Sequence, residues 1–424
     1  MKQVFRPAAY IRPALALSIC ALLPATACSG VTGNARLEAV EASGDGILRV
    51  GLVLDNTGDS SFLNAPQLAA ARLAIKEIND AGGHKGRPLE LLPVEAELDA
   101  TSQAQALVVA EADVVIGPTD SSHAAGVIDI LSRARTPLIS PANTAAGLTG
   151  IESGGYYFRT AAADVAQAPV LVKLAKDAGA ATISVLYQEG SYGNDVSDAV
   201  SQAAKQAGLD VAVTEEFKPG EAGEAAGAAG DAGSDAVILI ARDGAHGALA
   251  ELNNAGITGA RIILSDGAFA RYGSKLGSKA LEGARAIVPG QLPSAGFQER
   301  LLAVDGKLKD VSFAAETYDA ISLAALAAAK AQDDAGRSIA ANLISVSGGT
   351  AGASAETPAA ACPSYKECVT SLAAGTDINY DGESGPIAFD TNGDITTANF
   401  TVFTYAADNI PAATGRETAG RAAD

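Results

Sequence analysis

Tryptophan is absent from the 424-residue sequence, methionine occurs once, and aromatic residues make up only 5% of the chain. Histidine is almost as scarce: His84 lies in the turn GGHKG, His246 opens a predicted surface helix, and His123 follows Ser122. Neighbours in sequence do not face each other on a helix, so His123 is not placed to activate Ser122. The sequence contains no phosphate-binding loop and no nucleophile elbow. These absences predict a protein that is not an enzyme and holds no cofactor.

The chain has few basic residues: it contains 30 basic and 49 acidic residues, and its formal net charge is -19. This excludes nucleic acid as a partner, since its phosphates are bound through lysine and arginine. Hydrophobic residues make up 48% of the chain, which is typical of a globular protein rather than a disordered one. The length is sufficient for two domains of ordinary size.

The apolar stretch 14–23 follows a basic start and is too short to span a bilayer. It leads to ATAC at 25–28, which resembles the cleavage site of a bacterial lipoprotein. Residues 1–27 are then a lipoprotein signal peptide, Cys28 carries the lipid, and 28–46 form a flexible tether. A plain secretory cleavage beside an incidental cysteine is the alternative. The chain is expected to be exported and held by its lipid on the extracytoplasmic side of the cell membrane.

The two cysteines of the remaining chain, Cys362 and Cys368, lie in CPSYKEC. Export into an oxidising environment favours a disulfide that closes this small loop. A metal site is the alternative, but no histidine lies nearby and two thiols alone are a poor zinc cage. DINYDG at 377–382 begins like a calcium-binding loop, yet Ala388 stands where the bidentate glutamate is required. The segment is predicted to be a turn, and no metal is expected.

Strand and helix patterns alternate from residue 47 onward. The alternation restarts after YYFRT at 156–160, which predicts two doubly wound α/β lobes with parallel sheets. Ligands bind outside the carboxyl ends of such strands, so two facing lobes make a cleft. GPIAFD (385–390) and NFTVFTY (399–405) are predicted to close the ordered part as a pair of strands, with 411–424 a disordered tail. The other predicted strands are 47–54, 89–95, 112–118, 136–140, 181–187, 209–217, 235–242, 261–267 and 284–290, and the predicted helices are about 68–78, 102–111, 127–134, 165–178, 194–207, 221–232, 244–255, 313–331 and 336–346.

Nine motifs follow one another in order: VGLVLDNTG, AIKEINDAGGHKGRPLEL, VVIGPTDSS, PLISPANTAAGLT, YYFRT, YGND, ILSDG, ETYDAI and SGPIAFDTNGD. The series, spanning about 47–405, resembles the branched-chain amino-acid binding proteins of ABC importers, which have the type I periplasmic binding protein fold. The resemblance implies two lobes joined by three crossovers near 161–164, 289–293 and 385–389. The implied lobes are 47–161 plus 292–385, and 162–291 plus 386–410.

Small hydroxyl residues follow two neighbouring strands. Ser121 and Ser122 stand at the start of a helix, where unpaired N–H groups suit an anion without any arginine. The next strand leads to Ala142, Asn143 and Thr144. The resemblance implies that both loops hold the α-carboxylate of an amino acid, through hydroxyls of Ser121 and Thr144 and backbone groups near Ala142. The residues alone leave open that Ser121 is a helix cap and Thr144 a turn residue.

The resemblance also implies a carboxylate that faces the ligand's ammonium group. Asp266 follows a predicted strand and is the first candidate, and Asp164 after the first crossover is the second. Tyr192 matches a position whose ring closes over the ligand. The alternatives are a turn for Asp266, a helix cap for Asp164 and a surface position for Tyr192.

The sequence departs from the leucine-binding pattern in two places. Phe62 and Leu63 stand where that type has a tyrosine, which keeps an apolar wall but removes a hydroxyl. Arg242 stands where an aromatic residue is expected. It either pairs with Asp266 or Asp164, or binds a second carboxylate of the ligand, which favours a polar or acidic ligand.

The resemblance therefore implies a monomeric solute-binding lipoprotein that captures an amino acid or related small molecule. Its further partners would be the permease and ATPase subunits of an ABC importer. A sensor of the same fold that reports to a separate receptor is an alternative, and so is a surface protein without a ligand. The fold alone does not decide between them.

Overall fold

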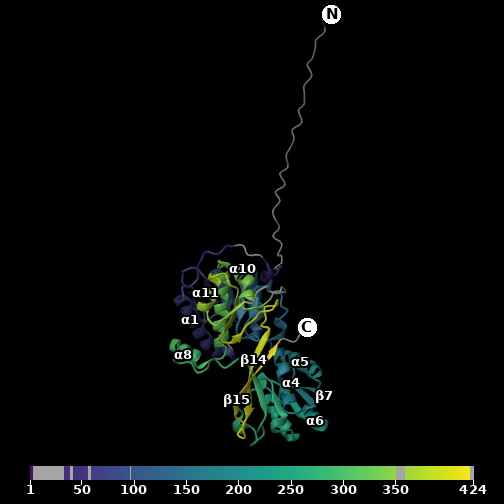
Figure 1. The fold of residues 1–424 in the computed structure, drawn as a ribbon. Coiled ribbons are helices and arrows are strands. Elements are labelled where there is room, and N and C mark those ends of the chain that lie inside the picture. Colours follow the sequence, from purple (N-terminus) through teal and green to yellow (C-terminus); the bar gives the residue numbers. More distant parts are fainter. Residues whose placement is uncertain (3–32, 39–41, 56–58, 96, 350–358, 421–424) are drawn as a thin grey trace.

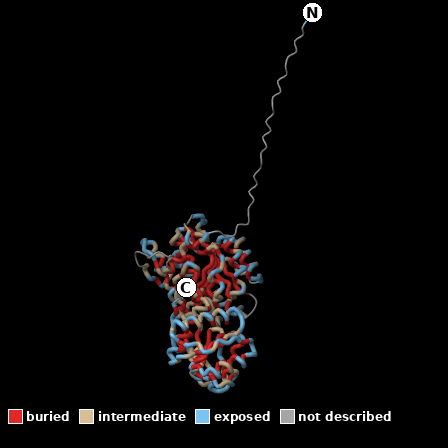
Figure 2. The backbone as a smooth tube through the Cα atoms, turned by 90° about the vertical axis from the view of Figure 1, so that its right-hand side faces the viewer, coloured by how far each residue is buried: buried red, intermediate tan, exposed pale blue. Residues whose placement is uncertain are grey.

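The structure, a computed structural model, describes residues 1–2, 33–38, 42–55, 59–95, 97–349 and 359–420. Figure 1 shows two α/β lobes arranged end to end, with α1, α8, α10 and α11 in one and α4, α5 and α6 in the other. Each lobe has its own buried interior, visible in Figure 2. Residues 3–27 of the expected signal peptide and Cys28 lie outside the described residues. None of the helices in the described part of the chain combines the length and the apolar composition that a membrane span requires.

The first lobe is built on a five-stranded parallel sheet with the order β2-β1-β3-β4-β5. β3 and β4 are buried along their whole length, because their side chains are covered from both faces. The helices α1, α9 and α10 contribute to one core beside the sheet, and α2 and α3 contribute to the other. The strands are β1 (Arg49–Leu52), β2 (Glu90–Leu91), β3 (Val114–Ile116), β4 (Leu138–Ser140) and β5 (Tyr157–Arg159).

One helix of this lobe, α9, is almost completely enclosed. Glu316, Lys330 and Ala331 are its only residues that are not buried. Small alanine side chains on several sides let α1 and α10 pack closely against it. The helices of the lobe are α1 (Asn64–Asp80), α2 (Ala100–Val109), α3 (Ser121–Ala134), α8 (Ala295–Val304), α9 (Ala314–Ala331), α10 (Gly336–Val346) and α11 (Tyr365–Ala373).

The second lobe has a seven-stranded sheet with the order β15-β14-β10-β9-β8-β6-β7. β6 to β10 are parallel, whereas β14 is antiparallel to both β10 and β15. Two hydrophobic cores hold its helices against the sheet. The elements are β6 (Thr182–Gln188), β7 (Asp210–Phe217), β8 (Ala236–Ile240), β9 (Ile262–Leu264), β10 (Arg285–Pro289), β14 (Thr397–Tyr405), β15 (Pro411–Gly420), α4 (Ala168–Asp177), α5 (Ser191–Ala207), α6 (Gly223–Ala232) and α7 (Ala245–Asn254).

The third connection between the lobes lies later in the chain than the sequence suggests. Ile387 and Phe389 are buried in the core of the first lobe, so the expected crossover at 385–389 is wrong. Phe389 pairs with Ile395 across a tight loop, and Ile395 packs against cores of both lobes. The chain therefore leaves the first lobe at about Ile395, because its apolar side chains anchor the preceding segment there.

The ends of the chain also correct the expectations. The segments 385–390 and 399–405 do not pair with each other. β13 (Gly385–Pro386) pairs with β12 (Ile378–Gly382), which also pairs with β11 (Ala360–Cys362), whereas β14 pairs with β15. The prediction of a turn at 377–382 is therefore wrong, because β12 occupies this segment. The prediction of a disordered tail at 411–424 is wrong for residues 411–420, which form β15. Hydrogen bonds to a neighbouring strand order β15, and its sequence, poor in large apolar residues, does not reveal this.

Part of the segment predicted as a tether is packed on the first lobe. Ala35 is buried in the core, and the guanidinium of Arg36 lies 4.8 Å from the centre of the Phe158 ring. The backbone N–H groups of Gly44 and Gly46 donate to the carboxylates of Asp333 and Asp334, respectively. The prediction of a flexible tether is therefore wrong for these residues. Their composition is that of a linker, but contacts with residues far away in the sequence hold them on the lobe.

The predicted disulfide is confirmed. Cys362 and Cys368 are bonded with an S–S distance of 2.00 Å, which ties β11 to α11. Across the described part of the chain, no group of three or more histidine, cysteine or acidic side chains is placed to hold a metal ion.

Candidate functional site

A cavity of about 920 Å3 lies between the lobes. Its size falls within the usual range for small-molecule sites. The ends of β3 and β4 and the start of α9 line it from the first lobe, and the starts of α5 and of the turn after β9 line it from the second. Of the predicted ligand-binding residues, Phe62, Leu63, Ser121, Ser122, Ala142, Thr144, Asp164, Tyr192, Arg242 and Asp266 line this cavity.

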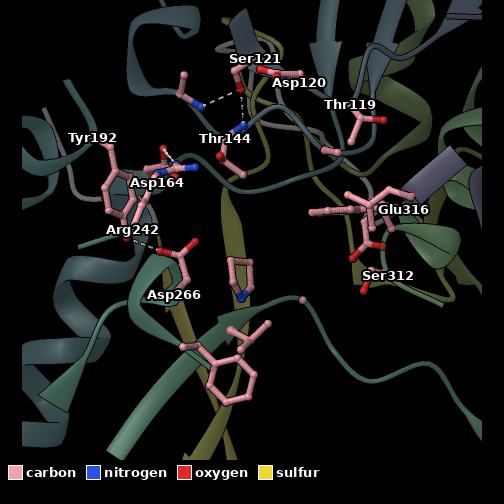
Figure 3. A pocket seen from close by; sticks show the side chains of 18 of the residues that line it. Thr119, Asp120, Ser121, Thr144, Asp164, Tyr192, Arg242, Asp266, Ser312 and Glu316 are labelled. Atoms are coloured by element: carbon pink, nitrogen blue, oxygen red, sulfur yellow. Dashed lines mark hydrogen bonds and ion pairs between the residues drawn. The ribbon is translucent and has the colours of Figure 1, made fainter. Parts of the chain in front are cut away.

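Ser121 joins the two loops of the first lobe. Asp120, not Ser121, caps α3, because its carboxylate accepts the Ser122 N–H at 2.8 Å. The Ser121 hydroxyl oxygen accepts the N–H groups of Thr144 at 3.2 Å and Ala145 at 3.4 Å. A hydroxyl has two acceptor positions and one donor. With both acceptor positions used, the O–H hydrogen of Ser121 is left to donate to an acceptor in the cavity (Figure 3).

A second layer of polar contacts fixes the start of α3. The buried carboxylate of Asp55 accepts the Asp120 N–H at 2.6 Å and binds Nδ1 of His123 at 2.7 Å. His123 is thus directed to Asp55 and not to its neighbour Ser122.

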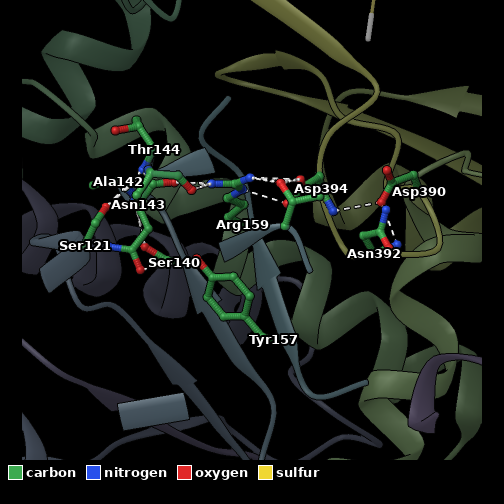
Figure 4. A network of polar contacts seen from close by, with 12 residues as sticks. Ser121, Ser140, Ala142, Asn143, Thr144, Tyr157, Arg159, Asp390, Asn392 and Asp394 are labelled. Atoms are coloured by element: carbon green, nitrogen blue, oxygen red, sulfur yellow. Dashed lines mark hydrogen bonds and ion pairs between the residues drawn. The ribbon is translucent and has the colours of Figure 1, made fainter. Parts of the chain in front are cut away.

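Asn143 lies behind the loop rather than in the cavity. Its side chain is fully buried and donates to the carbonyl oxygens of Pro118 at 3.0 Å and Thr119 at 3.1 Å. The structure therefore differs from the expectation that Asn143 contacts the ligand: its amide is used to hold the loop after β4 against the loop after β3 (Figure 4).

Arg159, which was not predicted as a site residue, binds the loop after β4 on the side of the protein interior. It is fully buried at the end of β5 and donates to the Ala145 carbonyl at 2.9 Å. It also makes two hydrogen bonds to Asp394, at 2.6 and 2.8 Å (Figure 4). The motif YYFRT contains this arginine, but only the fold reveals its partner, which comes from the segment before the third crossover.

Asp266 and Tyr192 form a hydrogen-bonded pair on the second lobe. The Tyr192 hydroxyl donates to Oδ1 of Asp266 at 2.5 Å, and Nε2 of Gln167 donates to the same oxygen at 2.9 Å. Burial, together with the charge of Asp266, raises the pKa of Tyr192 well above its ordinary value. Tyr192 therefore stays a donor and fixes Asp266 at the cavity wall. Gln167 was not anticipated, because nothing in its local sequence marks it.

Asp164 presents an unsatisfied carboxylate oxygen. The residue is only 6% exposed, and its Oδ1 has no hydrogen-bond partner among the described residues. Burial is the main cause that raises the pKa of Asp164 to about 6, and the nearby Asp266 adds to it. Buried polar atoms almost always have partners, so an orphaned oxygen in a cavity wall marks a place for a ligand donor.

Arg242 extends from the end of β8 over the Tyr192 ring, with its guanidinium carbon 4.2 Å from the ring centre. It lies 3.6 Å from Oδ2 of Asp164 and half of its side chain is exposed. Of the two roles considered for Arg242, the pairing with an aspartate of the cavity is thus present, and its partner is Asp164 rather than Asp266.

The sequence of this chain matches a known protein family over most of its length. Residues 47–409 match the model of the family described as periplasmic binding protein. The chain is similar to BasB, a chemotactic signal transduction system substrate-binding protein of Halobacterium salinarum, with 26% identity over 348 residues, or 79% of this chain and 81% of the relative. It is also similar to a leucine-, isoleucine-, valine-, threonine-, and alanine-binding protein of Pseudomonas aeruginosa, with 33% identity over 183 residues, or 41% of this chain and 48% of the relative.

Among solved structures, the chain is similar to a leucine-binding protein of Thermotoga maritima. The TM-score is 0.62 at 18% sequence identity, covering 88% of this chain and 99% of the other. This similarity shows the fold. The two relatives found by sequence are named as binding proteins and not by an enzymatic activity. The family match and the two-lobed architecture confirm the expected type I fold, and the chain belongs to the periplasmic binding protein family.

Proposed function

We propose that this chain is an extracytoplasmic solute-binding lipoprotein that captures an amino acid between its lobes and delivers it to an ABC importer. One observation carries the proposal, namely the opposite chemistry of the two cavity walls. The first lobe offers the Ser121 hydroxyl at the start of α3, and the second offers the carboxylates of Asp164 and Asp266. An α-amino acid carries a carboxylate and an ammonium group on one carbon, so a single ligand meets both walls.

The proposed carboxylate site consists of Ser121, Ser122, Thr144 and backbone groups near Ala142. Helix-start donors and hydroxyls are sufficient for one carboxylate. The proposed ammonium site consists of Asp164 and Asp266, with Tyr192 over the ligand. Because the ligand contacts both lobes, it binds the closed arrangement more tightly and shifts the population toward closure.

The proposal includes partners that the chain does not contain. The Pseudomonas relative is named for binding leucine, isoleucine, valine, threonine and alanine, which supports an amino acid as the ligand. The permease and ATPase would be separate chains, and the binding protein would act as a monomer. Lipidation of Cys28, which lies outside the described residues, would keep the protein next to the permease on the extracytoplasmic side of the membrane.

Thermal unfolding of the chain from residue 29 onward, with and without a panel of amino acids, tests the proposal. At about a hundred times its dissociation constant, a ligand stabilises the folded state by roughly 2.7 kcal/mol, which shifts the midpoint by several degrees. The panel contains aliphatic, polar, acidic and basic amino acids, with amides and aromatic acids for comparison. A panel in which no amino acid raises the midpoint would contradict the proposal.

Sensing is the second candidate, and the BasB relative favours it, because a chemotactic signalling protein is similar to this chain over 79% of its length. Deletion of the gene distinguishes the two functions. Loss of ligand uptake by the cells supports import, whereas intact uptake with a lost behavioural response supports sensing.

A further inference from the structure

The cavity is lined by far more negative than positive charge. Arg242 is the only basic side chain among the described residues that line it. That guanidinium lies 3.6 Å from a carboxylate oxygen of Asp164 and over the Tyr192 ring, so part of its charge is offset before any ligand binds. The acidic side chains that line the cavity are Asp120, Asp164, Glu189, Asp195, Asp266 and Glu316.

Glu316 stands apart from the other acids of the cavity. It lies in the first turn of α9, where its neighbours in the helix are buried and its own side chain faces the cavity. Its backbone carbonyl accepts the Thr160 hydroxyl at 3.0 Å, but no basic side chain pairs with its carboxylate in the described part of the chain. A Cβ built at Gly290 would lie 2.8 Å from the Glu316 Oε1. A side chain at this position of the second crossover would therefore clash with the carboxylate, and the glycine avoids the clash.

Glu316 and the proposed ammonium site lie at opposite ends of the cavity. Figure 3 shows Tyr192, Arg242, Asp164 and Asp266 on one side, and Glu316 with Ser312 on the other. A ligand whose ammonium group meets Asp164 and Asp266 would therefore direct its side chain toward Glu316. The orphaned Oδ1 of Asp164 is the acceptor proposed for the α-ammonium group, which leaves Glu316 as the acceptor for a second cationic group.

We propose that the cavity selects an amino acid with a second cationic group on its side chain, and that Glu316 receives this group. The inference rests on the proposed amino-acid function and names the ligand class. A carboxylate in a partly enclosed cavity wall without a counter-charge is unfavourable, and a ligand ammonium or guanidinium offsets that charge while making charge-assisted hydrogen bonds. An acidic side chain would instead meet like charge. The proposed ligand is therefore basic. Arg242 alone, without the acidic side chains around it, suggests an acidic ligand.

Calorimetric titration of the chain from residue 29 onward tests the inference with pairs of ligands that differ only in charge. Lysine is compared with norleucine, and arginine with citrulline, with glutamate as the acidic ligand. The basic ligand of each pair is expected to bind at least about tenfold more tightly than its neutral partner, a difference of about 1.4 kcal/mol. Glu316→Gln should abolish this preference, which is measured as the ratio of the dissociation constants of the neutral and the basic ligand of each pair. Glu299→Gln, on the exposed side of α8, is the matched control and should keep the preference.

The outcomes separate this inference from the function on which it rests. Equal binding of lysine and norleucine, or a preference that survives Glu316→Gln, overturns the role of Glu316 and leaves amino-acid binding intact. Absence of binding by every amino acid overturns both. Thermal unfolding of each variant shows whether it is folded, so a lost preference is not mistaken for a lost structure.

Discussion

The guanidinium of Arg159 and the carboxylate of Asp394 are joined by two hydrogen bonds although 235 residues separate them in the chain. Both are buried, and the pair lies directly beneath the loop that carries Thr144. Arg159 belongs to the last strand of the first sheet, and Asp394 to the segment that precedes the third crossover. The pair therefore links one wall of the cavity to the point where the chain enters the second lobe.

Asp394→Ala should destabilise the protein strongly, because it leaves the Arg159 charge buried without a partner. Removal of one member of a buried pair costs about 3–5 kcal/mol. Urea unfolding followed by circular dichroism measures this change. Asp129→Ala breaks the exposed pair with Arg133 and serves as the control; it should cost less than about 1 kcal/mol. Equal effects of the two variants would show that the buried pair has no special role.

Ser121→Ala should weaken amino-acid binding with a small effect on folding. The variant removes the donor proposed for the ligand carboxylate and also the acceptor that joins the loops after β3 and β4. A lost hydrogen bond to a charged group corresponds to about 1.5–3 kcal/mol, or roughly ten- to a hundredfold in the dissociation constant. Titration calorimetry measures it, with the exposed Ser278→Ala as the control. Unchanged affinity in Ser121→Ala would remove this residue from the site.

Asp164→Asn should flatten the pH dependence of the stability of the ligand-free protein. Burial raises the pKa of Asp164 from 3.8 to about 6. The folded state thus holds this proton more tightly than the unfolded chain does. The resulting stability is fully present below the unfolded pKa and is lost as the pH rises through the folded pKa. Unfolding free energies measured across this window should fall more steeply in the natural protein than in Asp164→Asn. Asp198→Asn, on an exposed part of α5, should keep the slope.

Ligand binding should show the complementary effect. An ammonium group favours the ionised form of Asp164, so binding near pH 6 should release a proton. Calorimetry in two buffers with different ionisation enthalpies counts the protons released. The affinity should fall as the pH drops below about 6, since binding then competes with protonation. A pH-independent affinity across this range would place Asp164 outside the ammonium site.

Cys28→Ser should release the protein from the membrane. The lipid that we propose for this cysteine would be the anchor, since a lipidated N-terminus partitions with membranes. Fractionation of cells that express either form, followed by immunoblotting, measures the distribution. Recovery of the natural protein in the soluble fraction would instead indicate plain secretory cleavage.

The regular helices were predictable from the sequence, and the first-lobe helices illustrate why. The pattern predicted 313–331 and 336–346, and the structure has Ala314–Ala331 and Gly336–Val346. Apolar periodicity and breakers determine such elements locally. β11, β12 and β15 were not predicted, because they are ordered by neighbouring strands rather than by their own composition. Strands that are stabilised by pairing with distant segments have only a weak pattern in their own sequence.

The site was predictable to the extent that it follows from strand ends. Ser121 and Thr144 could be placed together because neighbouring parallel strands deliver their following loops to one edge of a sheet. Gln167, Arg159 and Glu316 were missed, since their importance depends on which side chain they meet across the fold. Asn143 was misplaced for the same reason: the direction of a side chain in an irregular loop is set by its partners, here two carbonyl groups.

The pairing of β15 with β14 has a practical consequence for anyone who attaches a label to this protein. Gly420, at the end of β15, lies opposite Thr397, where β14 begins immediately after the third crossover. A tag or fluorescent partner attached directly after Gly420 would therefore lie beside the third crossover, and its bulk would bias the lobe closure that we propose for ligand binding. Reporters of ligand binding are better attached to an exposed side chain that takes no part in this pairing, such as Asp231 on α6.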